Sequence, residues 1–398
     1  MIYTLLAPEY MKTFACVGSA CELSCCTGGW DIAIDDKTAK KYLNCKDGEW
    51  KERFVNNIEA PNETKKSYLF ALNKNGNCVF LNDDRLCSIQ KRFGEGYLCD
   101  VCNNYPRLYM KLGNKFNKKA DLTCPEVIKK VLLSNKQITF VELRENLPPD
   151  KLRKISIPRV LNSKHQYYKN FNSLRNFSIQ TLQNQEYSLT ERLLILAYFF
   201  ESFKDKNNVD AETVIALFND LIEKKAVTAI FNEINTNRPF YYDFFRSIFD
   251  AIYNSVNDIA FKDYCQKFYK LNCLDRANKD TFFYIYDGEY KSFLHKNSLL
   301  MENYLVHSVF GNLFPFDGKD MWTSFVELVI RYVFTNFFLM GLVADGKKEV
   351  DSKEFLHCFA VMSRAFDATK LSCIMNASEY LENEGKNDIT HIFSLIKV

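Results

Sequence analysis

The sequence lacks an excess of either charge, and this absence excludes a class of partner. Among 398 residues, 52 Lys and Arg stand against 49 Asp and Glu, so the net charge is only +3. A protein that mainly neutralises phosphates along DNA or RNA carries a much larger positive excess. We therefore expect no nucleic-acid partner.

Long uncharged apolar runs are also lacking. The most apolar segment, residues 325–343, contains Glu327 and Arg331, whose charges are costly in hydrocarbon. We predict a buried core helix there and no membrane partner. The N-terminal run has no basic region and is cut short by Pro8 and Glu9, which is unlike a secretion signal. We therefore expect a cytoplasmic protein.

Two kinds of sequence succeed each other along the chain. After Ser188, apolar residues recur at helical spacing, as in Leu193, Leu194 and Ala197. The first 135 residues instead hold ten of the 14 cysteines and clear turn signals. We predict a mainly α fold: a small Cys-rich metal-binding domain with short β-hairpins and helices (1–135), a basic connector (136–187) and an all-α helical domain (188–398).

Local patterns predict how the first domain is built. Apolar residues alternate on both sides of Asn75-Gly76, which indicates a β-hairpin that brings Cys78 and Cys87 together. A short helix from Ser88, as its cap, to Phe93 should end at Gly94. A second short helix, from about 97 to 103, places Cys99 and Cys102 on one face because they are three residues apart.

The cysteines carry the chemical signal. They occur as Cys16-x4-Cys21-x3-Cys25-Cys26, Cys78-x8-Cys87, Cys99-x2-Cys102 and Cys124-Pro125. In a reducing compartment, clustered thiols favour metal ligands over redox groups or disulfides. No histidine precedes His165, so an all-thiolate site is required, and either zinc or an iron–sulfur cluster satisfies it. The metal then acts either as a structural staple or in the chemistry. The later Cys265, Cys273, Cys358 and Cys373 are interpreted as isolated core residues.

The spacing of residues excludes two motifs by which enzymes bind nucleotide cofactors. A radical S-adenosylmethionine motif needs a third cysteine where Gly28 stands, although Cys21-x3-Cys25 begins that pattern. Neither Gly28-Gly29 nor Gly94-Glu95-Gly96 forms the strand-to-helix loop of a dinucleotide-binding fold. The sequence therefore gives no nucleotide loop at which to place a donor.

Several motifs together resemble the flagellin lysine N-methylase family. They are the run from Ala7 to Trp30 with its four cysteines, Cys78-Val79-Phe80-Leu81, Leu86-Cys87-Ser88-Ile89-Gln90, Tyr105-Pro106-Arg107 and Leu122-Thr123-Cys124-Pro125-Glu126. Weaker similarity extends to Asn303-Tyr304-Leu305, Phe314-Pro315-Phe316 and Ser363-Arg364. The resemblance implies methyl transfer from S-adenosylmethionine to lysine ε-amino groups of flagellin by a protein that carries a [4Fe–4S] cluster, which favours iron–sulfur over zinc. The family cysteines correspond to Cys16, Cys21, Cys25, Cys26, Cys78, Cys87, Cys102 and Cys124. Cys45 and Cys99 have no counterpart in that pattern.

Methyl transfer to lysine sets requirements for the site. The ammonium must be deprotonated, and aromatic faces suit both the ammonium and the sulfonium of the donor. The candidate catalytic residues are Tyr105, Asp100 as base or orienting carboxylate, and Tyr109. The candidate donor-binding residues are Arg107, which can bind a carboxylate with two hydrogen bonds, Trp30 and Tyr97.

Other functions fit the same sequence. A metal-stapled adaptor or chaperone could bind flagellin without chemistry, and the thiols could equally serve a zinc- or iron-chelating protein. Methylation of flagellin separates the enzyme from both alternatives.

Overall fold

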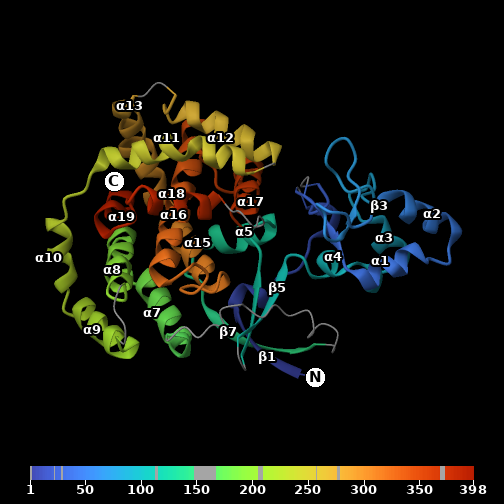
Figure 1. Ribbon diagram of the computed structural model, residues 1–398, viewed down its shortest axis with the longest axis horizontal. Coiled ribbons are helices and arrows are strands. Elements are labelled where there is room, and N and C mark those ends of the chain that lie inside the picture. Colours follow the sequence, from blue (N-terminus) through green and yellow to red (C-terminus); the bar gives the residue numbers. More distant parts are fainter. Residues whose placement is uncertain are drawn as a thin grey trace.

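The chain forms a large helical body, a four-stranded sheet against it and a small separate lobe (Figure 1). The computed structural model describes residues 2–21, 23–27, 30–112, 115–147, 167–204, 209–256, 258–275, 278–367 and 373–398. The predicted mainly α fold class, with a few short strands near the N-terminus, is confirmed.

Helices make up nearly all of the body. Polar caps begin many of them; Ser188 and Glu191, for example, form a reciprocal capping box at the first turn of α8. The helices of the body are α7 (Phe171–Gln183), α8 (Leu189–Glu201), α9 (Ala211–Glu223), α10 (Ala226–Glu233), α11 (Arg238–Ser255), α12 (Ile259–Leu271), α13 (Lys279–Ile285), α14 (Lys291–Lys296), α15 (Ser298–Gly311), α16 (Met321–Ala344), α17 (Lys353–Asp367), α18 (Cys373–Asn383) and α19 (Ile389–Ile396).

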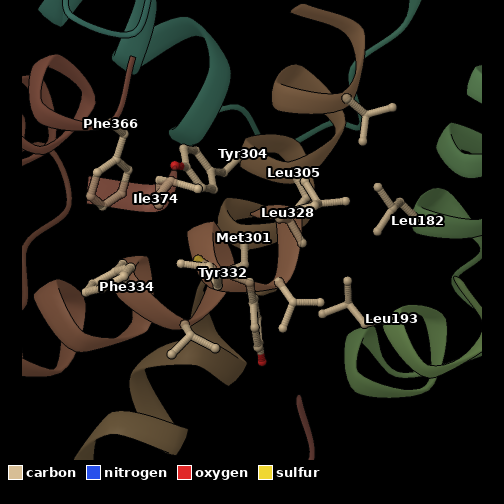
Figure 2. Close-up of a cluster of buried hydrophobic side chains, with 14 of the residues drawn as sticks. Leu182, Leu193, Met301, Tyr304, Leu305, Leu328, Tyr332, Phe334, Phe366 and Ile374 are labelled. Carbon is tan, nitrogen blue, oxygen red and sulfur yellow. The ribbon is translucent and has the colours of Figure 1, made fainter. Parts of the chain in front are cut away.

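Helix α16 is the centre of the body and confirms the predicted core helix. It begins at Asp320, whose carboxylate accepts the Thr323 N–H at 2.7 Å. It packs against α8, α12, α18 and α19. Figure 2 shows its Leu328, Tyr332 and Phe334 among side chains from neighbouring helices. By length and composition α16 is the one described helix apolar enough to cross a membrane, and 89% of its most apolar 18-residue window is buried in the fold.

A buried ion pair connects two helices of the body. Arg192 on α8 donates to Glu302 on α15 at 2.6 Å, and both side chains are almost fully buried. Gln137 and Gln185 donate to the same carboxylate. Because its oxygens are satisfied by these donors, the Glu302 charge is tolerated in the core.

A four-stranded sheet, formed by strands from near both ends of the predicted first domain and from the predicted connector, packs against the body. Its strands are β1 (Ile2–Pro8), β5 (Arg107–Leu112), β6 (Lys115–Ala120) and β7 (Phe140–Asn146), in the order β5-β6-β1-β7. Strands β1 and β6 are parallel, and the other pairs are antiparallel. His307 on α15 contacts the Tyr10 hydroxyl at 3.1 Å and the Ala120 carbonyl at 3.0 Å. The sheet is thus attached to the helices by polar contacts as well as by packing.

The lobe has its own aromatic core. The rings of Tyr42, Phe54, Phe70 and Phe80 pack against one another at its centre, with ring centroids 4.4–5.9 Å apart for the contacting pairs. Its elements are α1 (Asp36–Leu43), α2 (Gly48–Asn57), α3 (Ser88–Phe93), α4 (Asp100–Asn104) and a sheet of β2 (Ala33–Ile34), β4 (Tyr68–Phe70) and β3 (Ile58–Glu59), in that strand order.

The short elements of the lobe follow the sequence patterns, with three differences. The second short helix, α4, covers Asp100–Asn104 rather than 97–103, so Cys99 precedes the helix. Helix α3 has the predicted ends, and Gly94 closes it with a φ of 81°. Its cap, however, is Cys87, because the Ser88 hydroxyl donates instead to the Phe80 carbonyl at 2.8 Å. The turn at Asn75-Gly76 is present, but the expected hairpin is reduced to one bridge between Leu72 and Cys78, since β4 pairs with β2 and β3.

Packing divides the chain differently from the expected boundaries at 135 and 187. The lobe core draws its buried side chains from residues 32–99 only. Met11, Phe14 and helix α5 (Pro125–Leu132), from the predicted first domain, belong to the core of the body. The predicted connector contributes β7 and α7, while its residues 148–166 lie outside the described residues.

Candidate functional site

A thiol-lined pocket lies where the lobe meets the body. Its volume is about 170 Å³, and its walls come from the loop after β1, helices α3, α4 and α5, and the start of β5. Seven of the eight predicted metal ligands line it: Cys16, Cys21, Cys25, Cys26, Cys87, Cys102 and Cys124. The eighth, Cys78, is buried in the lobe core. Cysteines that are up to 108 positions apart in the sequence are thus collected at one place.

Local structure explains how the later cysteines reach the pocket. Cys87 caps α3, and Cys124 caps α5, in which Pro125 takes the first helical position. Cys102 lies in the short helix α4, which begins after Cys99. A cysteine at a helix start projects its thiol beside unpaired backbone N–H groups, which suit a thiolate.

The earlier cysteines lie in turns rather than in regular structure. Gly18 has a φ of 58°, a left-handed conformation that glycine adopts without strain, and it bends the chain between Cys16 and Cys21. The Arg85 guanidinium donates to the Cys21 carbonyl at 2.5 Å. The Trp30 indole N–H donates to the Cys25 carbonyl at 2.8 Å. Long side chains therefore hold this segment against the pocket.

Thiol contacts dominate the electrostatics of the pocket. A hydrogen bond between the Cys25 and Cys26 thiols lowers the pKa of Cys26 to about 7 and raises the pKa of Cys25. Burial raises the pKa of Cys124 to about 12, against the effect of the α5 backbone N–H groups. Without a cation, Cys25 and Cys124 therefore stay neutral in the pocket, whereas Cys26 ionises near neutral pH.

The donor set suits a thiophilic metal centre. All 14 cysteines are free thiols, and sulfur is the donor that iron–sulfur clusters and structural zinc sites use. In the described ranges, no three His, Cys, Asp or Glu side chains already converge at metal-binding distance. Coordination therefore requires the thiols around the pocket to rotate toward one another.

Tyr105, Arg107 and Trp30 lie at the pocket or next to it. Tyr105 and Arg107 line it directly. The Tyr105 hydroxyl is hydrogen-bonded to Thr123 at 3.1 Å, and the Trp30 ring packs edge-on against Tyr105 with centroids 5.3 Å apart. The Arg107 guanidinium lies 5.3 Å from the ring centroid of Phe14, another pocket residue.

Three other predicted site residues are not among the described residues that line this pocket. Tyr97 belongs to the lobe core, where its hydroxyl donates to Cys45 at 3.7 Å. Tyr109 on β5 donates to Glu145 at 3.3 Å. Asp100 begins α4, and its backbone N–H donates to Asp35 at 3.1 Å. Their nearness to the cysteines in sequence does not make them neighbours of the pocket.

Sequence reasoning missed several polar residues of the pocket. They are Arg85, Gln90, Glu95, Asn103 and Glu126. Arg364 on α17 was also assigned no role, yet its guanidinium lies 5.7 Å from the Trp30 ring centroid and pairs with Asp258 at 3.1 Å. Its place in the family-like Ser363-Arg364 pair was the available signal.

The cysteines of the body lie apart from the pocket. Cys265, Cys358 and Cys373 are almost fully buried in the core of the helical body. They are not isolated from one another, as the sequence suggested, because Cys373 and Cys358 both influence the pKa of Cys265, which burial raises well above its ordinary value. Apolar surroundings keep such thiols neutral and unreactive.

Comparison with known proteins identifies a family and several relatives. A family model described as the FliB lysine N-methylase C-terminal domain matches residues 175–395. The flagellar biosynthetic protein FliU of Salmonella muenchen is 35% identical over 131 residues, which cover 32% of this chain and 77% of FliU. The lysine-N-methylases of Salmonella choleraesuis and Salmonella typhimurium are 33% and 34% identical, and each alignment covers 32% of both proteins.

The two kinds of match carry different weight. The chain spans about a third of the length of the two lysine-N-methylases that it matches. No solved structure shows significant similarity to the chain. The family model, however, covers more than half of the residues, including almost the whole helical body. The chain therefore belongs to the FliB lysine N-methylase family.

Proposed function

We propose that this protein transfers methyl groups from S-adenosylmethionine to lysine ε-amino groups of flagellin, in the cytoplasm, and that the thiols of the pocket hold a [4Fe–4S] cluster. The observation that carries the proposal is the pocket itself, which brings seven thiols, Arg107 and Tyr105 together in a member of the FliB lysine N-methylase family. The flagellar and lysine-N-methylase names of its relatives support the substrate and the reaction.

The thiols facing the pocket are the proposed ligands of the cluster. When bound, a [4Fe–4S] cluster supplies a redox-active iron centre held by four thiolates. Arg85 and Arg107, both on the pocket wall, offset part of the negative charge that such ligands bring. Zinc held by four thiolates is the alternative occupant.

Arg107 is the proposed contact for the methyl donor. The methionine part of S-adenosylmethionine ends in a carboxylate, and a guanidinium binds a carboxylate through two parallel hydrogen bonds. The rings of Phe14 and Tyr105 on the same wall present aromatic faces to a sulfonium. This part of the pocket therefore offers complementary groups for both charges of the donor.

A lysine substrate must lose a proton before it can accept a methyl group. Burial raises the pKa of Tyr105 well above its ordinary value, so this hydroxyl stays protonated and is no base. Glu95 and Glu126 are the carboxylates that line the pocket, and we propose that they accept the ammonium proton. The lone pair of the lysine nitrogen then bonds to the methyl carbon as the methyl–sulfur bond breaks, which leaves a neutral thioether.

The deciding experiment is mass spectrometry of flagellin. Flagellin from the source organism is incubated anaerobically with the full chain and S-adenosylmethionine carrying a deuterated methyl group, and a reaction without the donor is the control. We expect labelled methyl groups on lysines of the flagellin. Unlabelled flagellin that nevertheless co-purifies with the protein would instead support the adaptor function.

A further inference from the structure

The N-terminal thiols fall into two groups that pack in different places. The lobe set comprises Cys26, Cys78, Cys87, Cys99 and Cys102, which belong to the aromatic core of the lobe or pack against it. Cys45 also belongs to that core, but its thiol accepts a hydrogen bond from the Tyr97 hydroxyl at 3.7 Å, and it is left out of the set. The junction set lines the pocket outside that core and comprises Cys16, Cys21, Cys25 and Cys124. Cys124 belongs to the core of the helical body instead. Nine of the ten N-terminal thiols are thus assigned to two neighbourhoods, and three members of the lobe set, Cys26, Cys87 and Cys102, also line the pocket.

Backbone contacts hold the lobe set together. The Cys78 N–H donates to the Cys26 carbonyl at 2.8 Å. Cys78 and Cys87 each form an antiparallel bridge, with Leu72 and Leu81, in two successive turns. Cys99 and Cys102 stand at the start of α4, where the Asn103 N–H donates to the Cys99 carbonyl at 2.9 Å. Three separate chain segments therefore supply thiols to one small region.

Two thiols of the lobe set lie behind the pocket wall. Cys78 and Cys99 are 5% and 0% exposed, and neither is among the described residues that line the pocket. The Leu81 N–H donates to the Cys78 carbonyl at 3.0 Å, and the Ser88 N–H, next to Cys87, donates to the Phe80 carbonyl at 2.7 Å. The lobe set therefore extends from the pocket wall, at Cys26, Cys87 and Cys102, to the buried Cys78 and Cys99.

A tight turn and the start of α5 bring the junction set to the pocket. The Gly18 N–H donates to the Cys16 thiol at 3.4 Å, and the Cys21 N–H donates to the Gly18 carbonyl at 3.1 Å. Cys124 lies at the start of α5 on the same pocket wall. Cys25 is next to Cys26 in the chain, so the two sets adjoin there. Unlike Cys78 and Cys99, all four junction thiols face the pocket.

We propose that the two sets bind two separate metal centres, a buried zinc ion in the lobe with Cys99 among its ligands and a second centre at the pocket held by the junction set. A structural zinc site is closed and takes four ligands, which the lobe set can supply with one thiol left over. The junction set has four thiols beside open space, where a centre can meet other molecules. Only the identity of the pocket centre as an iron–sulfur cluster rests on the proposed function.

The lobe also gives a physical reason for a buried metal. Its core is small, and its strands are only two or three residues long. Small domains with so little regular structure commonly depend on a metal for folding, because binding free energy then contributes to folding free energy. A zinc ion held by Cys78, Cys87 and the α4 cysteines would connect the two turns to α4.

Metal analysis of single cysteine variants tests the proposal. The full chain, expressed with both metals and purified anaerobically, is assayed for zinc and iron per chain and for visible absorbance. We expect one zinc and an iron centre in the wild type. Cys99→Ser should lose at least about four-fifths of the zinc and keep the iron absorbance, whereas Cys16→Ser should lose the iron absorbance and keep the zinc. Cys273→Ser, outside both sets, is the control and should keep both metals.

Two results would overturn the proposal. One is a Cys99→Ser variant with the full wild-type zinc content. The other is loss of zinc from Cys16→Ser together with the iron, which would mean that the thiols form a single centre. If Cys99→Ser does not fold, the Cys16→Ser arm decides alone, because zinc retention there requires ligands outside the junction set. None of these measurements depends on methylation of flagellin.

Discussion

Arg107 is the side chain whose chemistry is most specific in the pocket. A lysine in its place keeps the charge but loses the two parallel hydrogen bonds that a guanidinium makes to a carboxylate. We expect Arg107→Lys to raise the dissociation constant for S-adenosylmethionine by roughly tenfold or more, in line with ~1.5–3 kcal/mol for a hydrogen bond to a charged group. Calorimetric titration of the donor into the full chain measures the change.

A neighbouring lysine provides the matched control for that variant. Lys111 lies on the same strand, is exposed and is not among the described residues that line the pocket. Lys111→Ala should leave the dissociation constant unchanged. An unchanged constant in Arg107→Lys as well would remove Arg107 from the donor site, and loss of visible absorbance would make it a support of the metal centre instead.

Glu327 on α16 gives a pH-dependent prediction at the residue scale. Burial, and next the charge of Asp317, raise the pKa of this carboxyl from 4.5 to about 7. The folded state therefore holds this proton more tightly than the unfolded state, so this group lowers stability as the pH rises from about 4.5 to about 7. We expect Glu327→Gln to be more stable than the wild type at pH 8, by ~1–3 kcal/mol, and nearly equal to it at pH 4.

Denaturant unfolding at the two pH values measures this difference. Glu354→Gln, an exposed position on α17, is the control and should not change the pH dependence. Equal destabilisation of Glu327→Gln at both pH values would show that the carboxyl contributes through its shape or hydrogen bonds and not through its titration.

At the scale of the elements, the contact between α12 and α16 depends on a glycine. A Cβ at Gly341 would lie 2.5 Å from Cδ1 and 2.7 Å from Cβ of Phe268, a fully buried ring with no space to move into. We expect Gly341→Ala to destabilise the protein by about 1–3 kcal/mol through overpacking, although alanine is the better helix former. Thermal unfolding followed by circular dichroism measures the loss.

Another helical glycine isolates the packing effect. Gly288 has no atom within 4 Å of an added Cβ, and it lies in the π-helical segment Tyr286–Tyr290 between α13 and α14. Gly288→Ala should therefore be neutral or raise the melting temperature, because it removes backbone freedom from the unfolded chain. A rise in melting temperature in both variants would show that α12 and α16 can separate at no cost.

At the scale of the whole molecule, the division between lobe and body predicts what metal removal does. The lobe core is small and contains the lobe set of thiols, whereas β1, β5–β7 and α5 pack on the helical body. If the lobe set binds a metal as proposed, we expect chelation to unfold residues 30–104 first and to leave the rest folded, because the helical body has a large apolar core of its own. Limited proteolysis with mass spectrometry of the fragments locates the first cuts.

The expected first cuts lie within the lobe, and fragments that begin near residue 105 should persist. This outcome differs from what the predicted domain boundary at 135 implies, since β5, β6 and α5 would then unfold together with the lobe. An unchanged cleavage pattern after metal loss would show that the metal is no staple and would give its chemical role more weight.

Sequence alone determined the features that depend on neighbours along the chain. Helix α3 ends at Gly94, because glycine tolerates the positive φ that closes a helix. The continuous apolar pattern of α16 specified a buried helix, and the cysteine motifs with their family resemblance singled out the seven cysteines that line the pocket. These signals are local, because a helix cap, a helical repeat of apolar residues and the spacing of neighbouring metal ligands each involve only a short stretch of sequence.

Only the tertiary structure decided which distant segments meet. Pairing of β1 with β7 joins residues more than 130 positions apart. No hairpin turn connects these two strands, so local sequence cannot indicate that they pair. The same long-range packing placed Cys99 in the lobe set, moved Tyr97 and Asp100 away from the pocket, and brought Arg364 to Trp30. The type of a residue and its spacing from others thus determine which chemistry it can perform. Which side chains surround it depends on burial and long-range contacts, and these depend on the whole chain.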